Sequence, residues 1–258
     1  MNAFSYYVPT EIRFGKDAHL HTAELMKKHG GTRALIVYGG GSAVKSGLLD
    51  LISDQLAKEG LKSLPFGGAK PNPTLSHVGE GILAALDFHA DFILAVGGGS
   101  AIDSAKAIAH GAANPEADVW RFWAREIPLK KSLPIGVVLT ISAAGSETSG
   151  SSVITNDQTG EKRGLTAEFN RPRFAVMNPE FTYTLPKFQI ACGITDILMH
   201  TLERYFTLEE GNGLTDELAE TLLRVPIHDG RAAMKEPADY VAASELMWCG
   251  SLSHNGLT

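Results

Sequence analysis

The sequence lacks most of the features that mark secreted, membrane-spanning or nucleic-acid-binding proteins. It has only two cysteines, Cys192 and Cys249, with neither CxxC spacing nor a disulfide-rich pattern. No apolar run approaches the length of about 20 residues that crosses a bilayer. The first residues have no basic stretch followed by an apolar one, so we expect no signal peptide. A net charge of -6 argues against a cationic face for nucleic acid. We therefore expect a protein of the reducing cytoplasm, without a membrane or nucleic-acid partner.

What is present is a globular composition with a repeating pattern. Apolar residues make up 44% of the 258 residues and charged residues 20%. Over the first two thirds of the chain, short β-branched apolar runs that end at glycine alternate with amphipathic stretches. This pattern predicts βαβ units and a mostly parallel sheet. The predicted strands are residues 33–38, 61–66, 91–96, 135–140 and 174–177, and the predicted helices are 44–58, 75–88 and 101–110.

The character of the chain changes at Pro186. Residues 191–207, 214–223 and 240–253 favour helix, and no convincing strand follows. We therefore predict an α/β domain over residues 1–185 and an all-helical domain over 186–258.

The glycine turn Gly97-Gly98-Gly99-Ser100 is the most informative local feature. It follows an apolar strand and opens a helix, so its amides and the helix dipole would favour an anion. Glycine also lets a backbone approach a pyrophosphate without Cβ atoms in the way. The alternative is a tight βα turn that is glycine-rich for structural reasons, since the motif is neither GxGxxG nor a P-loop.

A second turn, Gly39-Gly40-Gly41-Ser42, follows the first apolar strand. NAD-selective folds commonly place an acid near such a strand end to hold the ribose 2′-hydroxyl, but here no acid occurs before Asp50. Ser42 and Lys45 would leave room and donors for a 2′-phosphate. The hypothesis is a preference for NADP(H) over NAD(H), and the alternative is an uninvolved surface turn.

Asp196 and His200 are four residues apart in a predicted helix. That spacing puts both side chains on one face, close enough to share an ion. A carboxylate with an imidazole suits Fe(II) or Zn(II) better than Mg²⁺ or Ca²⁺. The alternative is a solvated pair that only contacts itself.

Several short segments keep the order and spacing of one known family. They are PTEIRFGK (9–16), YGGGS (38–42), PNP (71–73), AVGGGSAIDSAK (95–106), GSE (145–147), NP (178–179), DxxxHxxE (196–203) and NGL (255–257). Together they resemble the iron-containing alcohol dehydrogenase family, most closely its butanol dehydrogenase and NADPH-dependent aldehyde reductase branch. The resemblance implies a Rossmann-like parallel-sheet domain followed by a helical domain, as in dehydroquinate synthase-like folds.

The resemblance also implies roles for individual residues. The 97–100 turn would bind the pyrophosphate, and residues 39–42 the adenosine end of the cofactor. Asp103 and Thr140 would lie near the nicotinamide. Lys162 would contact its ribose, and Asn72 would belong to the same cofactor site. Asp196 and His200 match the first two ligands of the catalytic metal, which would activate a short-chain alcohol or aldehyde for hydride transfer. A homodimer is implied as well.

The chain departs from the family pattern at the metal site. The family uses one aspartate and three histidines, and the last two histidines lie beyond Thr258, where this sequence ends. We therefore expect an incomplete helical domain and only part of the metal site. His254 aligns with a helix position before the third ligand and is not assigned a role. The other seven histidines are expected to be surface or loop residues: His19, His21, His29, His77, His89, His110 and His228.

Three hypotheses follow from this departure. The first is a metal-dependent dehydrogenase seen as a shortened chain. The second is a remnant that binds cofactor without a competent metal site. The third is a metal-free relative such as a maleylacetate reductase, which the presence of Asp196 and His200 disfavours. The missing helices would also leave apolar residues of the 240–253 helix, such as Leu246, Met247, Trp248 and Leu252, without cover.

Overall fold

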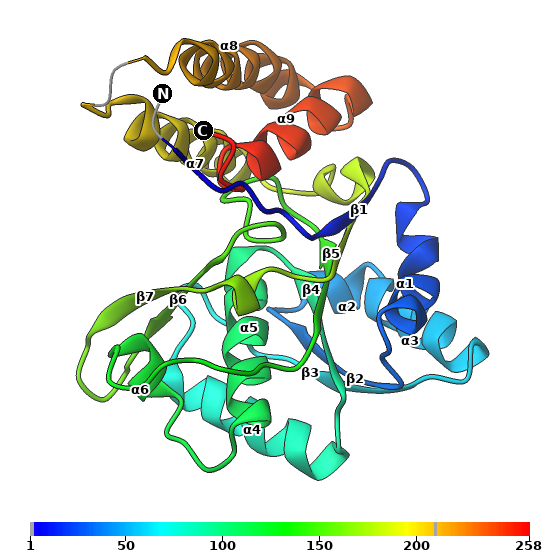
Figure 1. The fold of residues 1–258 in the computed structure, drawn as a ribbon. Helices are drawn as coiled ribbons and strands as arrows, with labels where there is room; N and C mark the ends of the chain where they lie inside the picture. The colour runs from blue at the N-terminus through cyan, green and yellow to red at the C-terminus, as the bar shows by residue number, and fades with distance from the viewer. Residues whose placement is uncertain (1–2, 209–210) are drawn as a thin grey trace.

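A six-stranded parallel sheet forms the centre of the α/β part (Figure 1). The computed structural model describes residues 3–208 and 211–258, so residues 1–2 of the predicted α/β domain and 209–210 of the predicted helical one lie outside it. The strand order is β1-β8-β5-β4-β2-β3, and β6 and β7 form a separate antiparallel hairpin. The strands are β1 (Glu11–Phe14), β2 (Arg33–Tyr38), β3 (Lys62–Phe66), β4 (Phe92–Gly97), β5 (Ile135–Leu139), β6 (Ser151–Thr155), β7 (Lys162–Thr166) and β8 (Phe174–Met177).

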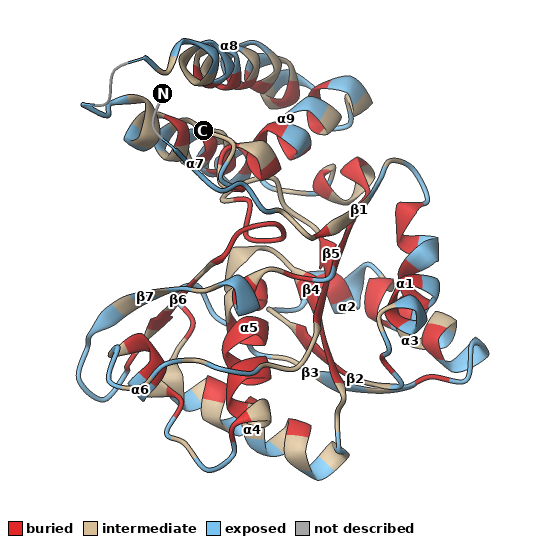
Figure 2. Cartoon of the chain, viewed as in Figure 1, coloured by how far each residue is buried: buried red, intermediate tan, exposed pale blue. Residues whose placement is uncertain are grey.

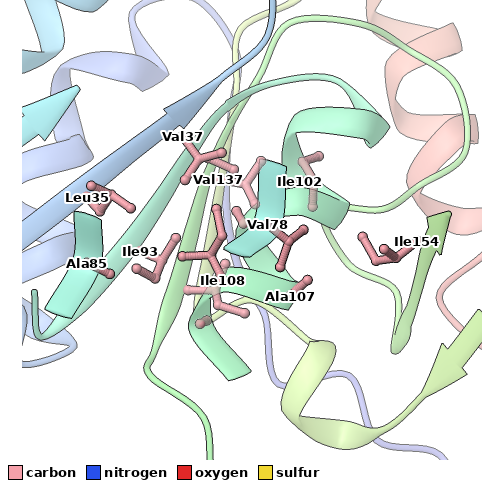
Figure 3. Close-up of a cluster of buried hydrophobic side chains, with 14 of the residues drawn as sticks. Leu35, Val37, Val78, Ala85, Ile93, Ile102, Ala107, Ile108, Val137 and Ile154 are labelled. Atoms are coloured by element: carbon pink, nitrogen blue, oxygen red, sulfur yellow. The ribbon is translucent and has the colours of Figure 1, made fainter. Parts of the chain in front are cut away.

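Helices cover both faces of the sheet, as in doubly wound folds. One core lies between α4, α5 and the sheet, and a second lies between α1, α3 and the opposite face. Figure 2 shows the resulting buried layers, and Figure 3 shows part of the first core. Burial on both faces explains the continuous apolar runs of the inner strands. The helices of this part are η1 (Ala18–His21), α1 (Thr22–Lys28), α2 (Ser42–Lys45), α3 (Leu48–Lys58), α4 (Leu75–Phe88), α5 (Gly99–Ala113), α6 (Trp120–Trp123), η2 (Glu168–Asn170) and η3 (Pro179–Thr182).

The five predicted strands are confirmed, with small shifts of their ends, and two differences stand out. Strand β1 and the β6–β7 hairpin were not predicted. The predicted helix 44–58 is divided, because Gly47 has φ 74° and separates α2 from α3. Glycine is the residue that adopts this left-handed conformation without strain.

Three helices follow the last strand: α7 (Lys187–Tyr205), α8 (Gly213–Lys235) and α9 (Tyr240–Leu252). Helix α8 runs well past the predicted end at residue 223 and contains Pro226. The expectation that the last helix has an uncovered apolar face is wrong for Leu246 and Met247. Leu246 is buried against α7 and α8, and Met247 belongs to the core between α4, α5 and the sheet. Trp248 is exposed, as expected. A domain boundary at 185/186 stays a prediction.

Among the described residues, no helix is both long and apolar enough to span a membrane. Both cysteines are free, with Cys192 exposed and Cys249 buried.

Two buried histidines, His19 in η1 and His110 in α5, correct the expectation that the remaining histidines lie at the surface or in loops. His110 is the more deeply buried of the two. It sits inside α5 with its side chain fully buried. Its Nδ1 lies 2.8 Å from Ser132 Oγ, and its Nε2 lies 2.7 Å from Asn170 Oδ1. Burial lowers the pKa of His110 to about 4, so the imidazole is neutral at neutral pH.

We expect this histidine to make the fold sensitive to acid. Its pKa is lowered on folding, so the unfolded chain binds the additional proton between about pH 6.5 and 4 and stability falls as pH falls. With the ordinary and the shifted pKa values of this histidine, the free energy of unfolding should fall by roughly 2 kcal/mol between pH 7 and pH 5. Urea unfolding of wild type and His110→Gln at both pH values measures this. The difference in free energy of unfolding between wild type and His110→Gln should be smaller at pH 5 than at pH 7. The same difference at both pH values would contradict the assignment.

Candidate functional site

The two glycine turns lie side by side at the carboxyl edge of the sheet. β2 and β4 are neighbouring parallel strands, and Tyr38 pairs with Val96 in their register. Gly39 and Gly97 follow these two residues directly. The strand order diverges here, because β2 leads outward to β3 whereas β4 leads toward β5. In open α/β sheets such a switch point forms the crevice where ligands bind.

The 97–100 turn has the geometry of an anion cradle. Gly97 has φ 152°, a conformation that favours glycine. A Cβ on Gly98 would lie 2.2 Å from Ile141 Cγ2, so this position has room only for glycine. Helix α5 begins at Gly99, and no side chain caps its first amides. These amides are therefore left to bind an anion, which fits a cofactor pyrophosphate.

Thr140 and Asp103 lie close to this turn. The Thr140 amide donates to the Gly97 carbonyl at 3.1 Å. Asp103 Oδ2 accepts from the Val153 amide at 3.0 Å, while its Oδ1 is closed off from solvent and has no hydrogen-bond partner among the described residues. Burial raises the pKa of Asp103 to about 6, against the opposing charge of Lys106. The Asp103 carboxylate is thus buried against β6, close to the turn.

Lys162 and Asn72 meet although they are distant in sequence. Lys162, on β7, donates from Nζ to Asn72 Oδ1 at 2.8 Å. Asn72 has φ 57°, so its loop makes a sharp turn before α4. The charge of Lys162 also acts on the Asp103 carboxylate. Three of the predicted cofactor residues thus share one neighbourhood.

The other predicted turn is open to solvent. Gly40, Gly41 and Ser42 are exposed at the start of α2, and Lys45 curls back toward Gly41. No acidic side chain occupies this turn. The turn therefore offers open space without a negative side chain.

Asp196 and His200 lie on one face of α7, as predicted. Asp196 Oδ1 and His200 Nε2 are 3.6 Å apart, and both side chains are partly exposed. Two donors at this separation fit neighbouring ligands of one divalent ion. Among the described residues, however, no three histidine, cysteine, aspartate or glutamate side chains form a metal-binding group.

A cleft of about 550 Å³ lies between the loop after β5 and α7. Ile141 and Ala143, in the loop after β5, line one side, and Gly193, Asp196 and Met199 of α7 line the other. Ile141 also packs on Gly98 of the anion cradle. Asp196 therefore borders this cleft directly, and the cradle adjoins it through Ile141.

Close backbone contacts hold the helices against the loop 142–145. A Cβ on Gly193 would lie 2.1 Å from the Ser142 carbonyl oxygen, and one on Gly250 would lie 2.9 Å from that of Ala143. Gly145 has φ 65°, and a Cβ there would lie 2.5 Å from the Gly250 carbonyl oxygen. These contacts therefore set how α7 and α9 sit above the sheet.

A buried charged cluster behind the site was not predicted from the sequence. Lys106 is fully buried and donates from Nζ to the carbonyls of Ser146 at 2.8 Å and Ser151 at 2.7 Å. Burial lowers the pKa of Lys106 to about 8 and raises that of Glu147. Glu147 accepts a hydrogen bond from Ser251 of α9. Both charged residues stood in the family segments, but nothing in their spacing indicated that they would be buried together.

The chain matches the family model described as iron-containing alcohol dehydrogenase over residues 9–179. It is 41% identical to NADH-dependent butanol dehydrogenase A of Clostridium acetobutylicum and 40% identical to the NADPH-dependent aldehyde reductase YqhD of Escherichia coli. Each alignment covers all of this chain and 66% of the relative.

The same similarity holds in three dimensions. The fold superposes on the crystal structure of NADH-dependent butanol dehydrogenase A from Thermotoga maritima with a TM-score of 0.96 and 38% identity, covering all of this chain and 64% of that one. The chain thus spans about two thirds of the length of the proteins it resembles.

Proposed function

We propose, given that this chain belongs to the iron-containing alcohol dehydrogenase family, that it serves metal-dependent hydride transfer between NADP(H) and a short-chain alcohol or aldehyde. The observation that carries the proposal is the common cleft, which Asp196 lines directly and which the anion cradle adjoins through Ile141. A hydride donor and an activated carbonyl must meet in such a space.

Residues of the α/β part would bind and orient the cofactor. The nicotinamide ring supplies the hydride chemistry when bound. The uncapped amides at Gly99 and Ser100 would hold the pyrophosphate. Lys162 and Asn72, already paired at 2.8 Å, would position the adjacent ribose, and the charge of Lys162 also acts on the buried Asp103 carboxylate.

Residues of α7 would bind the metal ion. A bound Fe(II) or Zn(II) would supply Lewis-acid activation of the substrate oxygen. Asp196 and His200 would hold it through one oxygen and one nitrogen, which suits either metal. Catalytic sites of this kind use three or more protein ligands, so the further donors would come from outside the described residues. Apolar lining by Ile141 and Met199 favours an aliphatic substrate chain.

The test is NADPH oxidation with butanal by the purified chain, with and without added Fe(II) or Zn(II). Metal-dependent turnover would support the proposal. Measurable NADPH binding without turnover, at any metal concentration, would favour the alternative of a cofactor-binding chain without a competent metal site. Absence of NADPH binding would overturn both.

We further propose a preference for NADPH, because the exposed 39–42 turn carries no acid and has Lys45 beside it. The relatives use either cofactor, as their names state, so membership of the family does not decide this point. We expect a smaller dissociation constant for NADPH than for NADH in a fluorescence titration. Lys45→Ala should narrow the difference, whereas Lys58→Ala, an exposed lysine of α3, should not. Tighter binding of NADH would contradict the preference.

Three broader proposals go with this function. The two free cysteines accord with a reducing cytoplasm. Exposed apolar side chains such as Phe188 and Phe206 offer surface that a second copy would bury in a homodimer. Residues 1–185 would act as the cofactor domain and 186–258 as the start of the metal domain.

A further inference from the structure

His254 lies beside the metal pair although the family pattern assigns it nothing. It follows the end of α9, and its ring packs against that of His200 with centroids 4.3 Å apart and a tilt of 42°. His200 belongs to α7, so the two rings come from segments more than 50 residues apart in the sequence. A contact of this kind is a tertiary feature that the helix spacing alone does not create.

The ring of His254 is held at both nitrogens. Its Nδ1 lies 2.9 Å from the Ala144 carbonyl, which is an acceptor only, so the ring proton resides on Nδ1 and donates to that carbonyl. Its Nε2 then accepts from the Ser151 hydroxyl at 3.4 Å. The imidazole is thereby fixed to the loop that lines the cleft.

His200 has no such anchor of its own. Its Nε2 lies 3.6 Å from Asp196 Oδ1. Among the described residues, its ring makes no hydrogen bond, and its other contact is the ring of His254. His200 also borders an open pocket that Met199 and Phe206 line, so there is space beside the ring for other orientations. The ring of His254, with its centroid 4.3 Å from that of His200, occupies space on another side of the ring and so restricts its orientation.

We propose that His254 is a positioning residue that holds the His200 imidazole toward Asp196. The inference rests on the proposed function in one respect, since the orientation matters chemically only if His200 binds metal. His254 itself is not a ligand in this arrangement, because its Nε2 faces Ser151 and the described residues contain no three-donor group. Groups that orient a metal-binding histidine typically change metal affinity by about 10- to 100-fold when removed.

The test reads the orientation of His200 directly, without metal or turnover. In the full chain labelled with ¹³C and ¹⁵N in histidine, His200 should show one side-chain rotamer by NMR couplings. His254→Ala should average that rotamer, while His228→Ala, which removes an exposed histidine of α8, should leave it unchanged. An unaltered His200 rotamer in folded His254→Ala would overturn the proposal. If alanine destabilises the fold, His254→Gln, whose amide can donate to Ala144 but has no ring, should give the same averaging.

A Co(II) titration followed by visible absorption separates this inference from the proposed function. Loss of about 10-fold in Co(II) affinity in His254→Ala, with an unchanged Tm, would support positioning at the metal site. If wild type takes up no Co(II), the metal part of the proposed function fails, and the NMR result alone decides the role of His254. Equal Co(II) affinity in wild type and variant would overturn the inference.

Discussion

Replacing Gly193 with alanine is expected to destabilise the chain and separate α7 from the α/β part. The added Cβ would lie 2.1 Å from the Ser142 carbonyl oxygen, which is backbone and has no rotamer to move. Overpacking of this kind costs about 1 to 3 kcal/mol, although glycine to alanine inside an exposed helix ordinarily stabilises by about 1 kcal/mol. Thermal unfolding should show a Tm lower by several degrees. The amides of the loop 142–145 should also exchange their hydrogens faster in the variant than in wild type, with NADPH present in both samples.

Gly213→Ala is the matched control. Gly213 opens α8, and a Cβ there would meet nothing within 4 Å. Its Tm should stay the same or rise slightly. Equal changes in Tm for the two variants would contradict the close packing of α7 on the loop.

Asp196→Asn is expected to abolish metal-dependent chemistry while cofactor binding persists. The substitution keeps the size of the side chain but removes the anionic donor beside His200. If wild type shows turnover, the rate should fall by at least about 100-fold. Removing a residue that only orients a metal ligand typically lowers activity by up to about 100-fold, and loss of a ligand should lower it at least as much. The dissociation constant of NADPH should not change, because the anion cradle is built on α5. Metal content by elemental analysis and NADPH affinity by fluorescence measure both effects.

Glu217→Gln serves as the control for Asp196→Asn. It removes the same kind of charge from an exposed position on α8. It should leave metal content and NADPH affinity at wild-type levels. A metal content equal to wild type in Asp196→Asn would exclude Asp196 as a ligand.

Continuous apolar runs made the inner strands predictable. Strands such as β4 are buried on both faces, and their composition reflects that burial directly. The β6–β7 hairpin was missed because its strands carry exposed polar residues, including Lys162, and lie outside the main sheet. Helix α8 was predicted too short because Pro226 indicates a break, yet tertiary packing buries that proline within the helix.

The site was predictable where its residues are local in sequence. The 97–100 turn and the four-residue spacing of Asp196 and His200 need only a strand, a turn and a helix to bring their groups together. The contacts of His254 with His200, and of Gly193 with Ser142, join segments far apart in the chain. Such contacts depend on how α7 and α9 pack on the loop, which no spacing in the sequence encodes.

The measurement that most directly tests the common cleft is nuclear relaxation of the nicotinamide protons of bound NADPH with Co(II) in place of Zn(II). We expect a paramagnetic ion held by Asp196 and His200 beside the cofactor to enhance relaxation of the nicotinamide protons strongly, and Asp196→Asn to remove the enhancement. Relaxation that is the same with Co(II) as with Zn(II) would contradict the common cleft, because cofactor and metal would then not share one space.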